Sequence, residues 1–183
     1  MRASTFHHPT LEQLEDFDVT PTLIEQGVVT PTWQYRIHET GERAEFDLAV
    51  LSDITKYPFR LQCEQFKLTR ILLDRLRRME CAEVRFGTEG VAAAQTDDAV
   101  EVMASHQGET IQLKGRYVIG ADGARSAIRH SLGLPFDGKT YPDASIVVVT
   151  SFEFRDHVPY LSGVNYCWGR NGEYFGLLRV QGR

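Results

Sequence analysis

The stretch YVIGADGARSAIRHSLG, residues 117–133, constrains the fold more than any other part of this 183-residue chain. A short apolar run ends at a Gly-Ala-Asp-Gly turn, and a basic segment of helical character follows. We expect a buried strand at 117–119 and a helix over 124–132 that Gly133 and Pro135 terminate. A strand joined to a helix by a turn of small residues is typical of α/β folds, in which ligands bind beyond the carboxyl ends of the strands.

Asp122 lies inside this turn, and two interpretations of it are open. Its carboxylate could accept hydrogen bonds from the hydroxyl groups of a cofactor sugar, since Gly120 and Gly123 let a ligand approach the backbone closely. Alternatively, Asp122 only starts the helix, because Asp is a favoured N-cap residue and Asp-Gly is a common turn. From these residues alone, the cap interpretation is favoured.

The first 80 residues predict helices and one hairpin. Leu68, Leu72, Leu76 and Met79 recur at helical spacing, which indicates an amphipathic helix over 64–80. We also expect a short helix over 8–17 and a helical turn over 20–29 that Gly27 closes. Residues 32–40 and 44–53 predict two strands bridged by Gly41.

The rest of the chain has the pattern of strands. From 81 to 119, short apolar segments alternate with turn signals, which predicts a small antiparallel meander that leads into the strand at 117–119. Residues 144–154, 164–169 and 174–180 are rich in β-branched and aromatic side chains and predict three more strands. The composition changes near 135–142, so we expect two domains, 1–138 and 139–183, in a mixed α/β (α+β) fold.

Composition and charge exclude several classes of function. The apolar content of 42% and the charged content of 25% are typical of a globular protein. A net charge of -5 argues against a sequence-nonspecific nucleic-acid binder, and no apolar run approaches the ~20 residues of a membrane span. Cys63, Cys81 and Cys167 are far apart, which favours reduced thiols in a cytoplasmic protein. The adjacent His7 and His8 would diverge on a regular element, so no metal site is expected.

The glycine pattern lacks one common cofactor motif. A dinucleotide-binding fold normally carries G-x-G-x-x-G after its first strand. None of the 15 glycines has another glycine two positions away, so this turn is not present in the sequence.

Three stretches, in order, resemble the FAD-dependent aromatic monooxygenases of the para-hydroxybenzoate hydroxylase family. YVIGADGARSAIRHSLGLPFDGKTYPD is similar to the Asp-Gly motif region of that family and is the most specific of the three. RASTFHHPTLEQLEDFDV resembles its Arg-containing loop and the following helix, and LQCEQFKLTRILLDRL resembles its Gln-bearing helix start. The resemblance covers most of residues 2–154.

The resemblance implies an incomplete fold. Residues 1–138 would form a partial FAD-binding domain of the glutathione-reductase type, containing the antiparallel meander and substrate-domain strands inserted near 30–55. Residues 139–183 would form part of a β-rich substrate-binding sheet. The family's glycine-rich βαβ unit would precede Arg2, and its later Gly-Asp motif would follow the sheet. Such a central segment exposes apolar faces and strand edges, so we expect self-association or a complementing chain.

The resemblance also implies roles for four residues. Arg2 would face the pyrophosphate and ribityl region of FAD, and Gln65 would meet the ribityl chain or the ring edge. Asp122 would accept hydrogen bonds from the ribityl hydroxyls, and Gly123 would leave room for FAD and for NAD(P)H. Each has an ordinary alternative, since Arg2 could be a terminal surface residue and Gln65 a simple helix-start residue. No catalytic acid or base is identified.

The implied activity is that of an aromatic hydroxylase. A complete site would reduce FAD with NAD(P)H, form a flavin hydroperoxide with oxygen, and insert one oxygen atom into a small aromatic substrate. For this chain alone we expect weak or absent FAD binding.

Two alternatives stay open: a catalytically inactive truncated remnant that acts as a binding or assembly module, and an unrelated α+β ligand-binding domain. Aromatic residues of the later strands could face substrate, although packing explains them better: Tyr160, Tyr166, Trp168, Tyr174 and Phe175.

Overall fold

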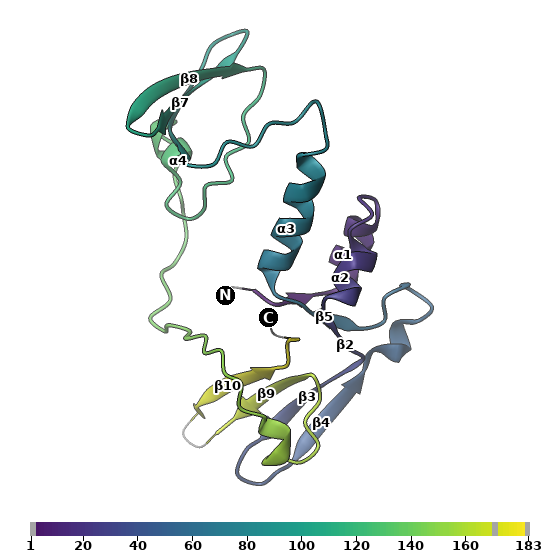
Figure 1. Ribbon diagram of the computed structural model, residues 1–183. Coiled ribbons are helices and arrows are strands. Elements are labelled where there is room, and N and C mark those ends of the chain that lie inside the picture. The colour runs from purple at the N-terminus through teal and green to yellow at the C-terminus, as the bar shows by residue number, and fades with distance from the viewer. Residues whose placement is uncertain (1–2, 170–171, 182–183) are drawn as a thin grey trace. The chain divides into compact units, whose positions relative to one another are not determined.

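The computed structural model describes residues 3–169 and 172–181 (Figure 1). The chain divides into two compact units, Met1–Glu80 with Ile146–Arg183 and Cys81–Ser145. The sequence-based division into 1–138 and 139–183 stays a prediction. Among the described residues, no helix is both long enough and apolar enough to cross a membrane.

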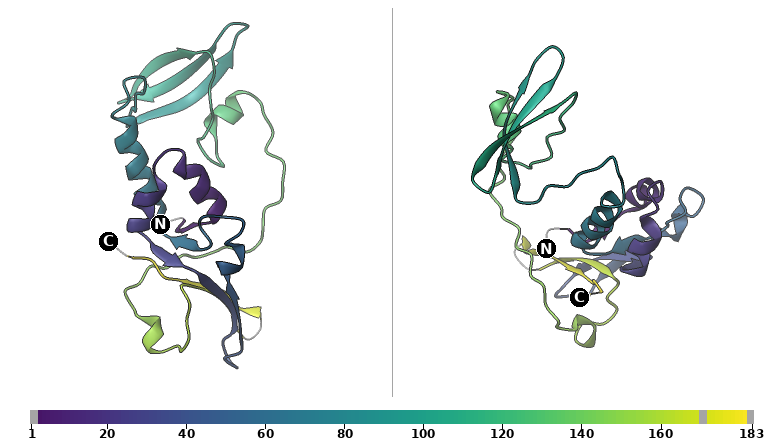
Figure 2. Two further views of the ribbon diagram at one scale, coloured as in Figure 1. Left: turned by 90° about the vertical axis from the view of Figure 1, so that its right-hand side faces the viewer. Right: turned by 45° about the horizontal axis from the view of Figure 1, so that its top comes forward.

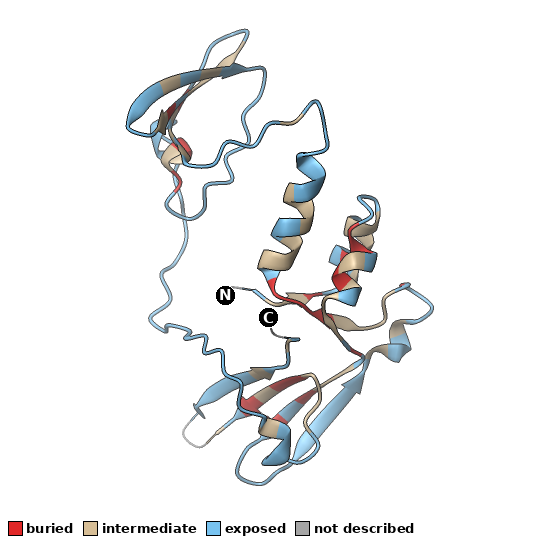
Figure 3. Cartoon of the chain, in the orientation of Figure 1, coloured by how far each residue is buried: buried red, intermediate tan, exposed pale blue. Residues whose placement is uncertain are grey.

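The core of the first unit lies between three helices and a three-stranded antiparallel sheet (Figures 1 and 2). In spatial order, the strands are β1 (Thr5–Phe6), β5 (Arg60–Gln62) and β2 (Val28–Thr30). The helices are α1 (His8–Glu15), α2 (Thr20–Glu25) and α3 (Gln65–Leu76). Their buried side chains form one cluster, coloured red in Figure 3: Phe6, Leu11, Val19, Leu23, Leu61 and Cys63.

Helix α3 follows the predicted apolar stripe for most of its length. Leu68 and Leu72 pack against the core cluster. The C-terminal part of the stripe is not covered, since Leu76 is 38% exposed and Met79 is 49% exposed. The helix therefore ends at Leu76 instead of continuing to residue 80.

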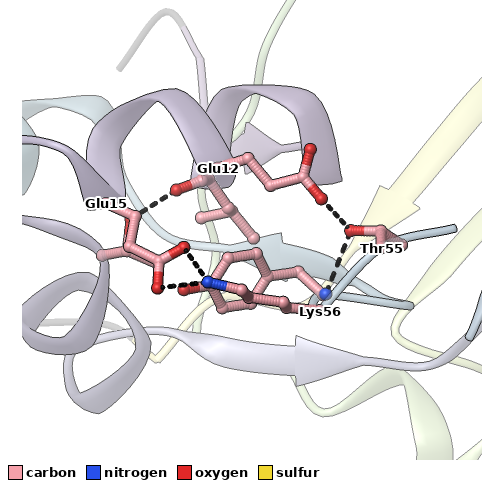
Figure 4. A network of polar contacts seen from close by, with 7 residues as sticks. Glu12, Glu15, Thr55 and Lys56 are labelled. Carbon is pink, nitrogen blue, oxygen red and sulfur yellow. Dashed lines mark hydrogen bonds and ion pairs between the residues drawn. The ribbon is translucent and has the colours of Figure 1, made fainter.

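A polar network attaches the loop before β5 to helix α1 (Figure 4). The buried hydroxyl of Thr55 donates to the Glu12 carboxylate and accepts the Tyr57 N–H at 3.1 Å. Lys56 forms an ion pair with Glu15 at 3.1 Å, but both side chains are exposed. Because solvent screens exposed ion pairs, Thr55 contributes more than Lys56 to holding the loop.

A four-stranded mixed sheet joins two distant parts of the chain. Its strands, in the spatial order β10-β9-β3-β4, are β10 (Tyr174–Leu178), β9 (Val164–Trp168), β3 (Thr32–Ile37) and β4 (Arg43–Asp47). β3 and β9 pair in parallel, and the other two pairs are antiparallel. The predicted hairpin is thus confirmed, although its second strand stops at Asp47. There the Asp47 carboxylate accepts the Ala49 N–H at 2.8 Å and starts a 3-10 turn.

Buried amides hold one face of this sheet against the segment 159–162. The Gln34 side-chain amide donates to the Tyr160 carbonyl at 2.9 Å and to the Asn165 side-chain oxygen. Asn165 in turn donates to the Ser162 carbonyl at 2.9 Å. Gln34 and Asn165 are both 2% exposed or less, so these bonds are shielded from water.

The two sheets of this unit meet closely at Gly163 and Thr30. Thr30 is the last residue of β2, and Gly163 immediately precedes β9. A Cβ atom at position 163 would overlap the Thr30 side chain. Only glycine therefore allows β9 to lie this close to β2.

The second unit is an antiparallel meander with one short helix. Its strands are β6 (Thr88–Gln95), β7 (Val100–His106) and β8 (Glu109–Gly115), as the sequence predicts. Helix α4 (Ala127–Ser131) packs on β6, where the Ser131 hydroxyl accepts the Ala93 N–H at 2.9 Å. Residues 82–86, at the start of the region predicted to form the meander, are not a strand.

Two other strand predictions are wrong. Residues 117–119 are not a strand, and Tyr117 and Ile119 are 87% and 89% exposed. Residues 144–153 are also irregular, with Ile146 87% exposed, and a 3-10 turn follows at Phe154–Asp156. A run of β-branched residues becomes a strand only when a neighbouring strand takes its hydrogen bonds, and no described strand pairs with either segment.

We predict that Gly163→Ala lowers the free energy of unfolding by roughly 1–3 kcal/mol, the usual cost of overpacking. The added methyl group must displace Thr30 or move β9 away from β2. Chemical denaturation of the purified chain measures the change. Thr30→Ala in the same chain should restore part of the loss, and a double variant no more stable than Gly163→Ala would contradict this contact.

Candidate functional site

Asp122 binds the N-terminal end of helix α4. Its carboxylate accepts the Ser126 hydroxyl at 2.6 Å and the Ile128 N–H at 3.2 Å. Ser126 is the N-cap residue itself, and its hydroxyl oxygen accepts the Arg129 N–H at 2.9 Å. Asp122 therefore caps the helix in two ways: it accepts one N–H of the first turn directly, and it orients the N-cap residue Ser126.

The turn around Asp122 is open to solvent. Residues 120–125 are all exposed. Gly123 has a φ of +85°, which side chains rarely tolerate, and a Cβ atom built there meets no atom within 4 Å. Each carboxylate oxygen can accept a second hydrogen bond. A ligand that carries hydroxyl groups can thus approach both the carboxylate and the backbone.

Hydrogen bonding keeps the Asp122 carboxylate ionised. The Ser126 hydroxyl and then the Ile128 N–H lower the pKa of Asp122 below the ordinary 3.8. At neutral pH the turn therefore presents a negatively charged acceptor.

Gln65 is the first residue of helix α3 and is exposed. Its backbone N–H donates to the Ala3 carbonyl at 3.0 Å, which ties the helix start to the strand β1 region. The preceding Glu64 pairs with Lys67 at 2.8 Å and makes no side-chain cap bond. Arg2 lies outside the described residues, so its predicted role stays a prediction.

The four-stranded sheet carries an aromatic face. Side chains alternate across a strand, and the register places one set of rings on the same side. Neighbouring rings lie 4.4 to 6.3 Å apart between centroids. The aromatic face consists of Trp33, Tyr35, Phe46, Tyr166, Trp168 and Tyr174.

This face is only partly covered. Tyr35, Phe46 and Trp168 are each about 40% exposed, and Tyr174 is 57% exposed. Burial, followed by the neighbouring Tyr166, raises the pKa of Tyr174, so its phenol remains protonated at neutral pH. Exposed clusters of aromatic side chains mark interaction surfaces.

Arg60 lies beside the aromatic face. Its guanidinium carbon is 4.5 Å from the centre of the Trp33 ring, and it donates to the Tyr166 hydroxyl at 3.2 Å. The pKa of the nearby His7 is lowered by partial burial, by the charge of Arg60 and by His8, so His7 is uncharged at neutral pH.

Sequence reasoning found only part of this face. It named Tyr166, Trp168 and Tyr174, which the structure brings together, but favoured packing for them. Phe175 lies on the opposite face, where it contacts His38, and Tyr160 lies on the preceding loop. Sequence reasoning missed Trp33, Tyr35, Phe46 and Arg60. The alternation of aromatic residues at 33 and 35 and at 166 and 168 was the available signal.

Comparison with known proteins identifies the family. The model of the family described as FAD binding domain matches residues 1–181. The chain belongs to this family. It is similar to the para-nitrophenol 4-monooxygenase of Pseudomonas sp. (strain WBC-3), with 31% identity over 157 residues that cover 85% of this chain and 39% of the relative.

Two further relatives agree. The 6-hydroxy-3-succinoylpyridine 3-monooxygenase HspB of Pseudomonas putida (strain DSM 28022 / S16) is 30% identical over 154 residues, which cover 84% of this chain and 39% of HspB. The crystal structure of p-nitrophenol 4-monooxygenase PnpA from Pseudomonas putida DLL-E4 superposes with a TM-score of 0.80 at 29% identity, covering 91% of this chain and 42% of PnpA. The chain thus spans about two-fifths of the length of these relatives.

These findings confirm the resemblance and the fold class. The mixed α/β architecture is that of the FAD-binding monooxygenases, and the family is one of flavin-dependent aromatic monooxygenases. The residues of the turn fit the ribityl part of FAD, because an ionised carboxylate beside an open glycine suits a chain of hydroxyl groups. Among the described residues, no cluster of side chains could hold a metal ion.

We predict that Asp122→Ala destabilises the chain in a pH-dependent way. The folded-state pKa of Asp122 is lowered, so its contribution to stability is present above the ordinary carboxylate pKa of 3.8 and is lost as the pH falls through the folded-state value. The difference in melting temperature between the natural chain and the variant should therefore shrink on acidification.

Ser126→Ala provides the matched comparison. It removes the N-cap hydroxyl, which costs ~1 kcal/mol. It also removes the strongest hydrogen bond to the Asp122 carboxylate but leaves that of the Ile128 N–H, so its stability difference should depend on pH less than that of Asp122→Ala. A stability difference for Asp122→Ala that stays constant into strong acid would contradict the proposed ionised acceptor.

Proposed function

We propose that the chain forms part of an FAD-dependent, NAD(P)H-using monooxygenase that hydroxylates a small aromatic substrate. The family match over residues 1–181 carries this proposal. Relatives named for the oxygenation of para-nitrophenol and of 6-hydroxy-3-succinoylpyridine support an aromatic substrate.

Bound FAD would supply the redox chemistry, taking electrons from NAD(P)H and activating oxygen for transfer to the ring. In this proposal, Asp122 accepts hydrogen bonds from the ribityl hydroxyls, and Gly123 leaves the space that the cofactor needs. Gln65 offers an exposed amide that both donates and accepts, suited to the ribityl chain or the ring edge. Arg2 would bind the pyrophosphate.

The aromatic face would hold the substrate ring. Ring stacking orients an aromatic ligand, and the surrounding apolar surface excludes water from it. Tyr166 and Arg60 place polar groups at the edge of the face, where a substituent of the ring can be bound. None of these residues is assigned as a catalytic acid or base.

One observation favours a second role, as an inactive module that assembles with a complementing chain or with itself. Tyr117, Ile119, Ile146 and Val148 are each at least 78% exposed, in irregular segments that no described strand pairs with. Unpaired apolar segments of this kind associate with other strands. In that role, FAD binding and turnover would require the added polypeptide.

The wide spacing of the three cysteines supports a cytoplasmic location.

FAD binding by the purified chain tests the proposed function. Because this chain alone is expected to bind FAD weakly, we measure binding by titrating FAD with the protein and following the flavin absorbance. We expect Asp122→Ala to weaken FAD binding roughly tenfold, the effect of losing a hydrogen bond to a charged group. Ser126→Ala is the control, because it weakens the same helix end but keeps the carboxylate.

Equal FAD affinities of Asp122→Ala and Ser126→Ala would contradict the role of Asp122. A stable, colourless oligomer that takes up no FAD would instead favour the assembly role. NAD(P)H use is tested by bleaching of the flavin absorbance on its addition.

A further inference from the structure

Arg60 reaches the aromatic face because of its position in β5. The neighbouring Leu61 is fully buried in the core cluster, so Arg60 points to the opposite side of its sheet. It pairs in register with Thr30, the residue that contacts Gly163 at the start of β9. This contact between the two sheets brings the guanidinium over Trp33, at 4.5 Å, and beside Tyr166.

The charge of Arg60 is not neutralised by the described residues. No described carboxylate forms an ion pair with Arg60. Strand β4 carries two acids, but Glu45 pairs with Gln34 and Asp47 with Thr32, so both point away from the aromatic face. His7, the other basic group close to Arg60, is uncharged at neutral pH.

The guanidinium also keeps free hydrogen-bonding capacity. An arginine side chain has five N–H donors, and the described contacts of Arg60 use one of them, to the Tyr166 hydroxyl. The contact with the Trp33 ring and the hydrogen bond to Tyr166 hold the guanidinium in place, and its other donors have no partner among the described residues. A half-buried cation with a fixed orientation and free donors is suited to an oxygen anion.

We propose that Arg60 determines the specificity of this site by selecting aromatic ligands that carry an anionic oxygen group, such as a phenolate or carboxylate. The ring of the ligand lies on the aromatic face, and its charged substituent binds the guanidinium edge. This inference rests on the proposed function, since it specifies the substrate class of the same site.

Intrinsic fluorescence tests the proposal without turnover. Trp33 and Trp168 are the two tryptophans of the chain, and both belong to the aromatic face, so ligand binding there quenches them. The probes are 4-nitrophenol, at a pH at which it is ionised, and 4-nitroanisole, its neutral methyl ether. We expect the natural chain to bind the anion at least roughly tenfold more tightly, the scale of a charge-assisted hydrogen bond.

Arg60→Met should abolish this preference while retaining apolar contact with Trp33, and Arg60→Lys should restore part of it. Arg43→Met is the matched control. Arg43 also stacks on an aromatic ring, that of Tyr160 at 4.4 Å, but it pairs with Arg36 and so lies on the opposite face. Its removal should leave the preference intact. Melting temperatures of all variants check that the fold is kept.

A preference for the anion that survives in Arg60→Met, or is lost equally in Arg43→Met, would overturn the proposal, as would quenching by neither probe. The FAD titration described above is read from a separate signal. Retained FAD binding without an anion preference would therefore reject the role of Arg60 alone, whereas loss of FAD binding would reject the proposed function.

Discussion

The buried amide pair of Gln34 and Asn165 is the interaction on which the first unit depends. These residues are 131 positions apart in the chain, and their side chains bond directly between the parallel strands β3 and β9. Burying an amide is costly unless it is hydrogen-bonded, and a shift of register by one residue would break the bond between the Gln34 amide N–H and the Asn165 side-chain oxygen. Hydrogen bonding therefore specifies how the two halves of the sheet align.

The aromatic face on the opposite side of the same sheet follows from this register. With Gln34 and Asn165 facing the segment 159–162, the alternating residues Tyr35 and Tyr166 must face the other way, where they lie directly across from each other. Rings from four strands thereby become neighbours, although they come from segments that the sequence separates widely. The contact of Thr30 with Gly163 then adds Arg60 to their edge.

Local sequence patterns predicted the local elements. The stripe of Leu68 and Leu72 marked helix α3, and Gly41 marked the hairpin, because helical periodicity and turn preference are encoded within a few residues. The turn at Asp122 was also located from its neighbours. By contrast, the apolar segment at Tyr117 was predicted to be a buried strand, and it is exposed. Burial depends on which other segment lies beside it, and a local apolar pattern does not contain that information.

In the candidate site too, residues within one motif could be predicted, whereas contacts between distant segments could not. The family resemblance predicted cofactor-binding roles for Gln65 and Asp122, since each belongs to a contiguous motif, and these roles stay predictions. Trp33 and Arg60 could not be predicted as partners, because their proximity depends on sheet pairings that no single segment reveals. The structure thus adds an aromatic face with one cation at its edge, and we propose that this face binds the ligand.

Hydrogen–deuterium exchange of the backbone amides tests the parallel pairing of β3 with β9 most directly. If the two strands pair as described, the amides of 32–37 and those of 164–168 exchange slowly and at similar rates. Those of 144–153, which no described strand pairs with, exchange rapidly. Exchange of 164–168 as fast as that of 144–153 would contradict the pairing, and with it the aromatic face.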